Sequence, residues 1–288
     1  MPTKVEKDIV TGTETTGHEW DGIKELNTPL PKWWLYVLWA SVIWALVYFV
    51  LYPSIPWFTG YYKGVLGYSQ RVEHAATMKA ARAAQSKFFN QIKALAPADI
   101  LKNASLRDFA RAGGRAAFAD NCAPCHAAGG GGRPGFPVLA DDDWIWGGKI
   151  GDILTTIQYG VRSDHDDTRT SEMPKFSEDD TLKPAQIEAV TDYVMALSGK
   201  GTGKSTAAAK ALFGEHCESC HKADGKGNPE LGAPNLTDAI WLYGSTKGEI
   251  MAQIAGPKHG VMPAWVGRLD DVTIKMLAVY VHSLGGGK

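Results

Sequence analysis

The sequence predicts a mainly α-helical protein in which one N-terminal transmembrane helix is followed by two tandem small domains of the same kind. Three features of the 288 residues predict it: a long apolar run near the N-terminus, an internal repeat in the C-terminal part, and four cysteines that fall into two copies of one motif. Hydrophobic residues make up 44% of the chain and charged residues 21%, which is the composition of a folded protein.

The apolar run extends from Trp33 to Tyr52 (residues 33–52) and contains no charged residue. At about 1.5 Å per residue, a helix of this length crosses roughly 30 Å, the thickness of the hydrocarbon core of a bilayer. Trp and Tyr gather at both ends, as in interfacial aromatic belts, and Pro53 ends the helix. A polar segment, residues 1–32, precedes the run and no small-residue cleavage site follows it. A membrane anchor is therefore favoured over a signal peptide or a buried core helix.

Residues 53–111 form a linker between the anchor and the repeated domains. Within it, the stretch from Ser69 to Leu95 is rich in Ala, Gln, Lys and Arg and predicts a helix, which Pro97 stops. We interpret this helix as a spacer.

Residues 112–199 and 206–288 are two copies of one domain. Equivalent positions are 95 residues apart at the cysteine motifs, 97 apart downstream and 89 apart at two Met-Pro pairs; examples are Cys122/Cys217, Trp144/Trp241 and Met173/Met262. Each copy ends in a helix-like stretch, and the first copy carries an extra polar loop before its Met-Pro pair. The Gly-, Ser- and Lys-rich segment 198–206 is predicted to be a flexible linker between the copies.

All four cysteines belong to two CxxCH motifs, which are the attachment signature of c-type haem. Two thiols three residues apart on a helical turn point the same way, so each can form a thioether with one vinyl group, and the following histidine reaches the iron. Because both motifs occupy equivalent positions of the repeat and use every cysteine, a zinc site or a disulfide is disfavoured. The sequence therefore predicts two covalently bound haem c groups in two tandem class-I cytochrome c domains. The predicted attachment residues are Cys122, Cys125, Cys217 and Cys220, and the predicted axial histidines are His126 and His221.

The sixth iron ligands are predicted to be Met173 and Met262, each of which is followed by a proline. A methionine thioether is a soft ligand that raises the haem potential, and the proline would fix the loop that presents it. Core methionines are commoner in general, but the two matched pairs favour ligands. In sequence order, the pairs are His126 with Met173 and His221 with Met262. Two closed, six-coordinate irons would suit electron transfer.

Other side chains are expected around the haems. The carbonyls of Pro137 and Pro234 are placed to accept a hydrogen bond from the axial histidines, and Trp144 and Trp241 are candidates to wall the haems. His165 and His259 precede the two methionines and could be alternative ligands or gates; we favour surface or haem-edge positions for both.

Charge is distributed unevenly along the chain. The net charge is +4 over residues 1–111, −7 over 112–199 and +2 over 200–288, although the whole chain sums to −1. The acidic segment indicates either a docking face for a basic electron donor or an ordinary solvated surface. On the docking hypothesis, charge reversal at Asp141, Asp142 and Asp143 slows reduction by the donor at low salt.

The haem motifs also indicate location, because the machinery that attaches haem to CxxCH acts outside the cytoplasm in bacteria. The haem domains are therefore expected in the periplasm and residues 1–32 in the cytoplasm, with a single pass through the bacterial inner membrane. Lysines before the span give at most a weak positive-inside signal.

Three stretches resemble the dihaem cytochrome c subunit (subunit III) of cbb3-type cytochrome c oxidases. They are IKELNTPLPKWW at 23–34, TRTSEMP at 168–174 and DGKGNPELGAPNLTDAIWLYG at 224–244. The resemblance covers nearly the whole chain after residue 20. It implies an electron-transfer subunit that is not catalytic alone, within a respiratory-chain oxidase that serves oxidative phosphorylation.

The resemblance also implies partners. Electrons would come from a cytochrome c or the cytochrome bc1 complex and pass through a monohaem cytochrome c subunit to the haem–copper catalytic subunit, which reduces oxygen and pumps protons. Membrane lipid is a further expected partner and nucleic acid is not. Two alternatives remain open: a membrane-tethered dihaem shuttle serving another reductase, and a dihaem peroxidase. The two Met-Pro pairs argue against the open iron site that a peroxidase needs, and a sensor would be expected to carry an output module.

Overall fold

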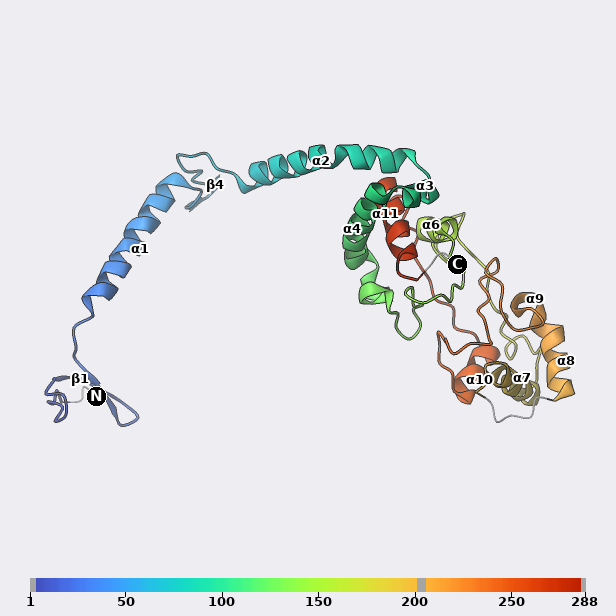
Figure 1. Ribbon diagram of the computed structural model, residues 1–288. Helices are drawn as coiled ribbons and strands as arrows, with labels where there is room; N and C mark the ends of the chain where they lie inside the picture. Colours follow the sequence, from blue (N-terminus) through green and yellow to red (C-terminus); the bar gives the residue numbers. More distant parts are fainter. Residues whose placement is uncertain (1–3, 201–205, 286–288) are drawn as a thin grey trace. The chain divides into compact units, whose positions relative to one another are not determined.

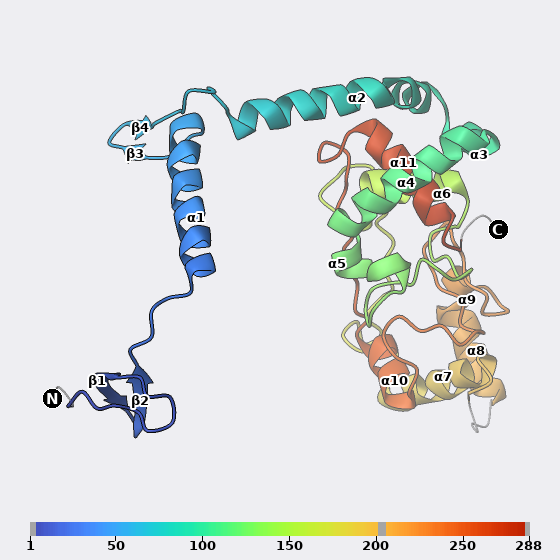
Figure 2. The ribbon, with the colours of Figure 1, turned by 60° about the vertical axis from the view of Figure 1, so that its left-hand side comes forward.

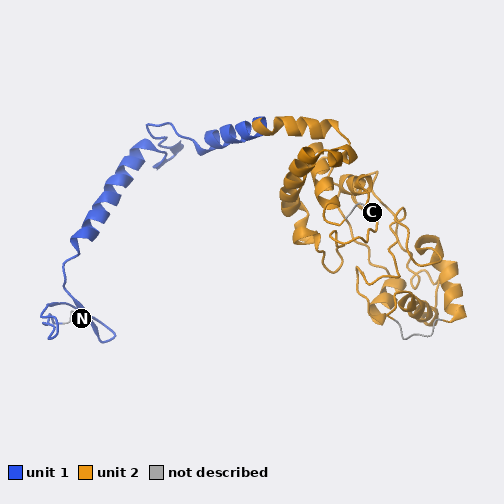
Figure 3. Cartoon of the chain, in the orientation of Figure 1, with its two compact units in different colours: residues 1–83 blue, residues 84–288 orange. Residues whose placement is uncertain are grey.

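The structure is a computed structural model that describes residues 4–200 and 206–285. Its described part is mainly helical, as predicted, and the chain divides into two compact units, residues 1–83 and 84–288 (Figure 3). The second unit therefore contains both repeated domains. Most of the linker expected at 198–206 lies outside the described residues.

The first unit contains the candidate membrane span. Strands β1 (Thr15–Trp20) and β2 (Ile23–Leu26) form an antiparallel pair before helix α1 (Lys32–Leu51), and the short strands β3 (Pro56–Trp57) and β4 (Gly60–Tyr61) follow it. Helix α1 has 20 residues and a mean hydropathy of 2.0, and none of its residues is buried against the rest of the protein. Among the described residues it is the one helix long and apolar enough to cross a membrane. It coincides within one residue with the span predicted from the sequence.

The helix expected from Ser69 to Leu95 is also confirmed, as α2 (Gln70–Ala94). Its last turns pack against α3 (Pro97–Lys102), α4 (Ala104–Asn121) and one face of the C-terminal helix, around the fully buried Ile92 and Ile100. Lys275 donates from Nζ to the carbonyls of Lys93 and Leu95, at 2.8 and 3.1 Å. A cation bonded to the last carbonyls of a helix satisfies orphan acceptors and opposes the helix dipole, so Lys275 ties the spacer to the domains that follow.

The remaining elements form the repeated domains. In chain order they are α5 (Ala123–His126), the 3₁₀ helix η1 (Ala128–Gly130), α6 (Ile150–Tyr159), α7 (Pro184–Leu197), α8 (Ala207–His216), α9 (Glu218–His221), α10 (Lys247–Ala255) and α11 (Asp271–His282).

The two copies exchange their last helices. Helix α11, at the end of the second copy, packs on α4 and α6 of the first, whereas α7, at the end of the first copy, packs on α8 and α10 of the second (Figures 1 and 2). We call the two resulting bodies the Cys122 lobe (α3 to α6 with α11) and the Cys217 lobe (α7 to α10). The sequence repeats at 112–199 and 206–288 therefore do not coincide with the packed lobes.

The buried side chains follow the same exchange. One core cluster joins Phe118, Ile153 and Ile157 to residues of α11, and the other joins Phe213, Ile250 and Ile254 to residues of α7. The exchanged contacts of α11 are Ile274, Leu277, Tyr280 and Val281, and those of α7 are Ile187, Val190, Tyr193 and Val194. An apolar helix face predicts burial but not the partner, so either repeat could supply the closing helix.

Equivalent aromatic pairs mark the two helix crossings. The rings of Phe118 and Tyr280 have centroids 5.3 Å apart in the Cys122 lobe, and those of Phe213 and Tyr193 are 5.1 Å apart in the Cys217 lobe. In the first crossing, a side chain at Gly114 would collide with the Met276 carbonyl and the Cβ of Tyr280. Glycine therefore allows α4 and α11 to approach at this point.

The chain passes between the lobes at two neighbouring segments that are joined by an isolated β-bridge. Val161 and Met262 exchange both backbone hydrogen bonds, each at 2.9 Å, where the first copy leaves the Cys122 lobe and the second enters it. Gly160 has a φ of +73°, and a side chain there would collide with the Met262 carbonyl. The crossing thus depends on glycine for both its backbone conformation and its close approach.

Candidate haem-binding sites

Each CxxCH motif forms a single helical turn after a longer helix. In both, the backbone N–H of the histidine donates to the carbonyl of the first cysteine at 2.9 Å, in α5 for His126 and in α9 for His221. The next residues, Ala127 and Lys222, have φ values of +62° and +61°, so the chain turns sharply away. The two motifs therefore share one local geometry.

The histidines of both motifs make the predicted contacts with proline carbonyls. The Nδ1 of His126 lies 3.0 Å from the Pro137 carbonyl, and the Nδ1 of His221 lies 3.0 Å from the Pro234 carbonyl. A carbonyl can only accept, so Nδ1 carries the proton and Nε2 keeps the lone pair that a metal ligand needs. Burial lowers the pKa of both imidazoles, against a smaller opposing effect of the carbonyl bond, and so favours the neutral form that binds iron.

The methionines lie in the opposite lobes from those that sequence order predicts. Met262 packs against the core that includes Cys122 and Trp144, whereas Met173 packs against the core that includes Cys217 and Trp241. The Met-Pro loops cross between the lobes together with the closing helices. The packing thus favours the pairs His126 with Met262 and His221 with Met173.

Two buried donors lack a partner. Among the described side chains, the indole N–H groups of Trp144 and Trp241 are the buried polar atoms without a hydrogen bond. Leaving such a donor unpaired costs about 1–3 kcal/mol, so equivalent orphans in both repeats indicate an acceptor that the protein chain does not supply. The propionate of a haem is such an acceptor, so these residues fit a haem in each lobe.

In each CxxCH motif the first cysteine is the more buried of the two. Burial, with a smaller contribution from the neighbouring cysteine, raises the pKa of the Cys122 and Cys217 thiols to about 11. No group of three or more His, Cys, Asp or Glu side chains within residues 4–200 and 206–285 is placed to hold a metal ion.

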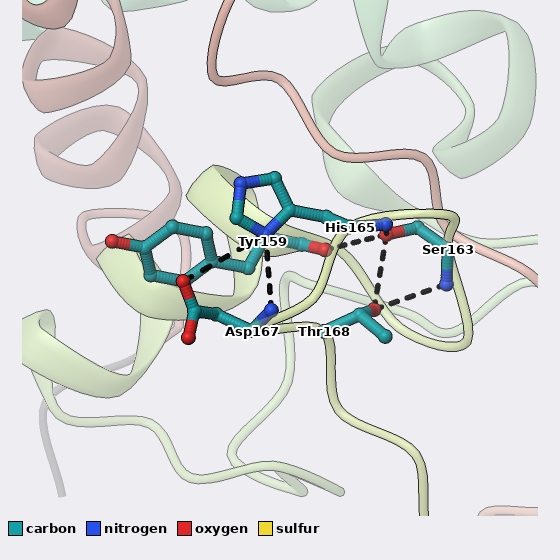
Figure 4. A network of polar contacts seen from close by, with 5 residues as sticks. All are labelled: Tyr159, Ser163, His165, Asp167 and Thr168. Carbon is teal, nitrogen blue, oxygen red and sulfur yellow. Dashed lines mark hydrogen bonds and ion pairs between the residues drawn. The ribbon is translucent and has the colours of Figure 1, made fainter.

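His165 is held within the extra loop of the first copy. Its ring lies against Tyr159, with centroids 4.9 Å apart, and its Nδ1 accepts from the backbone N–H of Asp167 at 3.1 Å (Figure 4). The Ser163 hydroxyl donates to the Tyr159 carbonyl at 2.7 Å and lies 3.0 Å from the Thr168 hydroxyl. These contacts indicate that His165 stabilises the conformation of the loop.

The acidic run 141–143 is only partly exposed. Burial, and then the charges of Asp238, Asp141 and Asp142, raise the pKa of Asp143 from 3.8 to about 6. The folded state therefore prefers the protonated carboxyl, and the stability it contributes is present below about pH 4 and is lost as the pH rises to about 6.

We accordingly expect Asp143→Asn to stabilise the chain at pH 7 by on the order of 1 kcal/mol, after discounting for the half-exposed position, and to change little at pH 4. Denaturant unfolding at the two pH values measures this difference. Asp142→Asn, at an exposed position, is the control. Equal effects of Asp143→Asn at both pH values would contradict the expectation.

Comparisons with known proteins match the N-terminal region and each of the two repeats to known families. Residues 12–59 match a family model described as the N-terminal domain of cytochrome oxidase-cbb3, FixP; residues 112–198 match cytochrome c; residues 204–281 match cytochrome c oxidase, cbb3-type, subunit III. A FixP subunit of cbb3-type cytochrome c oxidase from Sinorhizobium medicae is 52% identical over 98% of this chain and 97% of its own. The FixP subunit of a Bradyrhizobium species is 50% identical over 98% of both chains, and the CcoP subunit of Azospirillum brasilense is 49% identical over 98% of this chain and 99% of its own.

Proposed function

Because the chain belongs to the family of FixP and CcoP subunits of cbb3-type cytochrome c oxidases, we propose that it takes electrons from a donor cytochrome and passes them toward the oxidase's catalytic subunit. It is an accessory cytochrome c subunit and not the catalytic one. Cytochrome c domains imply covalently bound haem c. One repeated arrangement carries the proposal. Each lobe has a CxxCH turn, a histidine whose Nδ1 contacts a proline carbonyl, and a buried indole N–H without a partner, and this set suits one haem in each lobe.

Each haem would be held by residues of both copies. Cys122, Cys125 and His126 would hold the first haem with Met262, which packs in the same core as Cys122. Cys217, Cys220 and His221 would hold the second with Met173, which packs in the same core as Cys217. The bound groups supply one-electron chemistry. Pro137 and Pro234 fix the imidazole tautomers, and the indole N–H groups of Trp144 and Trp241 would donate to the haem propionates.

Helix α1 would anchor the chain in the bacterial inner membrane, with the two lobes in the periplasm and the N-terminal segment in the cytoplasm. Attachment of haem to CxxCH outside the cytoplasm supports this orientation. The proposed partners within the complex are the haem–copper catalytic subunit and the monohaem cytochrome c subunit that receives the electrons.

The donor would dock on the Cys217 lobe. Residues 171–257 carry twelve Asp and Glu against eight Lys and Arg, whereas 104–170 and 258–288 together carry eleven of each. The stretch that contributes most, Glu178, Asp179 and Asp180, is exposed and follows Met173 closely in the chain. A basic donor cytochrome would be steered to this lobe, because complementary fields raise the rate of encounter.

Charge reversal tests this docking face. We expect Asp179→Lys with Asp180→Lys to slow reduction by a basic cytochrome c about tenfold at low salt and to have little effect at high salt. Stopped-flow reduction of the purified complex measures the rates, with Asp142→Lys as the comparison on the other lobe. A larger effect of Asp142→Lys would contradict docking on the Cys217 lobe and indicate that the donor binds at the acidic run 141–143.

Purification of the chain from membranes in mild detergent tests the proposed function itself. We expect co-elution with b-type haem, copper and cyanide-sensitive oxygen consumption. A chain that elutes alone, with its c-type haem but no oxidase activity, would overturn the oxidase assignment and favour a membrane-tethered shuttle.

A further inference from the structure

The two Met-Pro loops meet at the crossing between the lobes, and one side chain touches both. Arg162 donates from Nε to the Gly260 carbonyl at 2.8 Å and from Nη1 to the Ser171 carbonyl at 2.9 Å. Gly260 lies two residues before Met262, and Ser171 lies two residues before Met173. A single half-buried guanidinium thus braces the backbone ahead of both methionines.

A histidine provides a second tie between the same loops. His259 accepts at Nε2 from the backbone N–H of Met173, at 3.1 Å, although the two residues belong to different copies of the repeat. The segment before His259 is itself fixed, because the Gln253 side chain bonds both the N–H and the carbonyl of Lys258, each at 3.1 Å. The Met262 loop therefore carries an acceptor that holds the Met173 loop.

We propose that Arg162 and His259 form a clasp that positions the two methionines together, Arg162 acting on both loops and His259 on that of Met173 alone. The proposal rests on the crossed ligation proposed above. Guanidinium geometry suits the role, because its planar fork can bond two carbonyls at fixed angles, whereas an ammonium group at the same reach would satisfy one. The two residues are positioning residues that act through the backbone.

The clasp predicts which haem responds to which substitution. In Arg162→Ala both reduction potentials should fall, and the weak red absorption band of methionine-ligated ferric haem should diminish at both sites. In His259→Ala only the haem at Cys217 should change, and His259→Gln, whose side-chain oxygen can accept in place of Nε2, should restore it. Arg162→Lys should lower the potentials less than Arg162→Ala, because an ammonium group can still bond one of the two carbonyls. Arg268→Ala, which removes an exposed arginine, should change neither haem.

Redox titration of the full-length chain in detergent, with absorption spectra and total haem content, tests this pattern. Amide hydrogen exchange at Met173 and Met262 gives a second readout, and both amides should exchange faster in Arg162→Ala. A response confined to one haem, or none in a folded Arg162→Ala chain that holds two haems, would overturn the clasp and leave the proposed function intact. A chain without two haems would instead contradict the proposed function.

Discussion

Replacing Met262 with alanine is expected to remove the sulfur ligand from the haem attached at Cys122 and Cys125 and to leave the other haem with its ligand. Met262 is the last methionine with a following proline, so sequence order assigns it to the second CxxCH motif, whereas it packs beside Cys122. Loss of a thioether ligand lowers the potential, by on the order of 0.2 V within the roughly 0.8 V range that axial ligands set.

The experiment uses a chain in which Cys217 and Cys220 are alanine, so that a single haem remains on Cys122 and Cys125. In this background, Met262→Ala should abolish the red absorption band and lower the potential, whereas Met173→Ala should leave both unchanged. The reverse result would show that each copy supplies its own ligand. Haem staining of the purified chains verifies that each variant has kept its haem.

A second large effect is expected at the helix crossing of the Cys122 lobe. Phe118 is buried against Tyr280, so Phe118→Ala should destabilise the chain by about 3–5 kcal/mol. A double-mutant cycle with Tyr280→Ala should give a coupling energy of about 0.5–1.5 kcal/mol, because the two rings touch.

The matched cycle pairs Phe118→Ala with Tyr193→Ala, since Tyr193 would be the partner if the first copy closed on its own helix. Here the two effects should add within about 0.5 kcal/mol, as for residues that share no contact. Denaturant unfolding followed by circular dichroism supplies the free energies. Coupling to Tyr193 in place of Tyr280 would rule out the exchanged packing.

Local patterns predicted much of this molecule. The uncharged run at 33–52 predicted helix α1, the Ala-rich stretch before Pro97 predicted α2, and the prolines after each motif predicted the carbonyls that orient His126 and His221. Each of these features is decided by residues close together in the chain, where helix period, proline geometry and motif spacing are sufficient.

The exchange of helices could not be predicted in this way. Helices α7 and α11 come from equivalent parts of the repeat, and Tyr193 and Tyr280 offer the same kind of ring to Phe118 or Phe213. Equivalent faces make the two arrangements nearly equal in local energy, so the choice depends on where the connecting loops lead. Arg162 belongs to no recognisable sequence motif, so its contacts with Gly260 and Ser171 could not be predicted and are seen only in the folded structure.

The exchange also sets an order of assembly during synthesis. The Cys217 lobe, from Met173 to α10, is complete once residue 255 has emerged, but the Cys122 lobe still lacks α11, residues 271–282. Vectorial folding usually finishes the N-terminal domain first, whereas here the domain that emerges first acquires its closing helix and its methionine last. Until α11 has emerged, the Cys122 lobe keeps the apolar surface of Phe118, Ile153 and Ile157 uncovered, so the lobe that contains the first haem motif is the last to be completed.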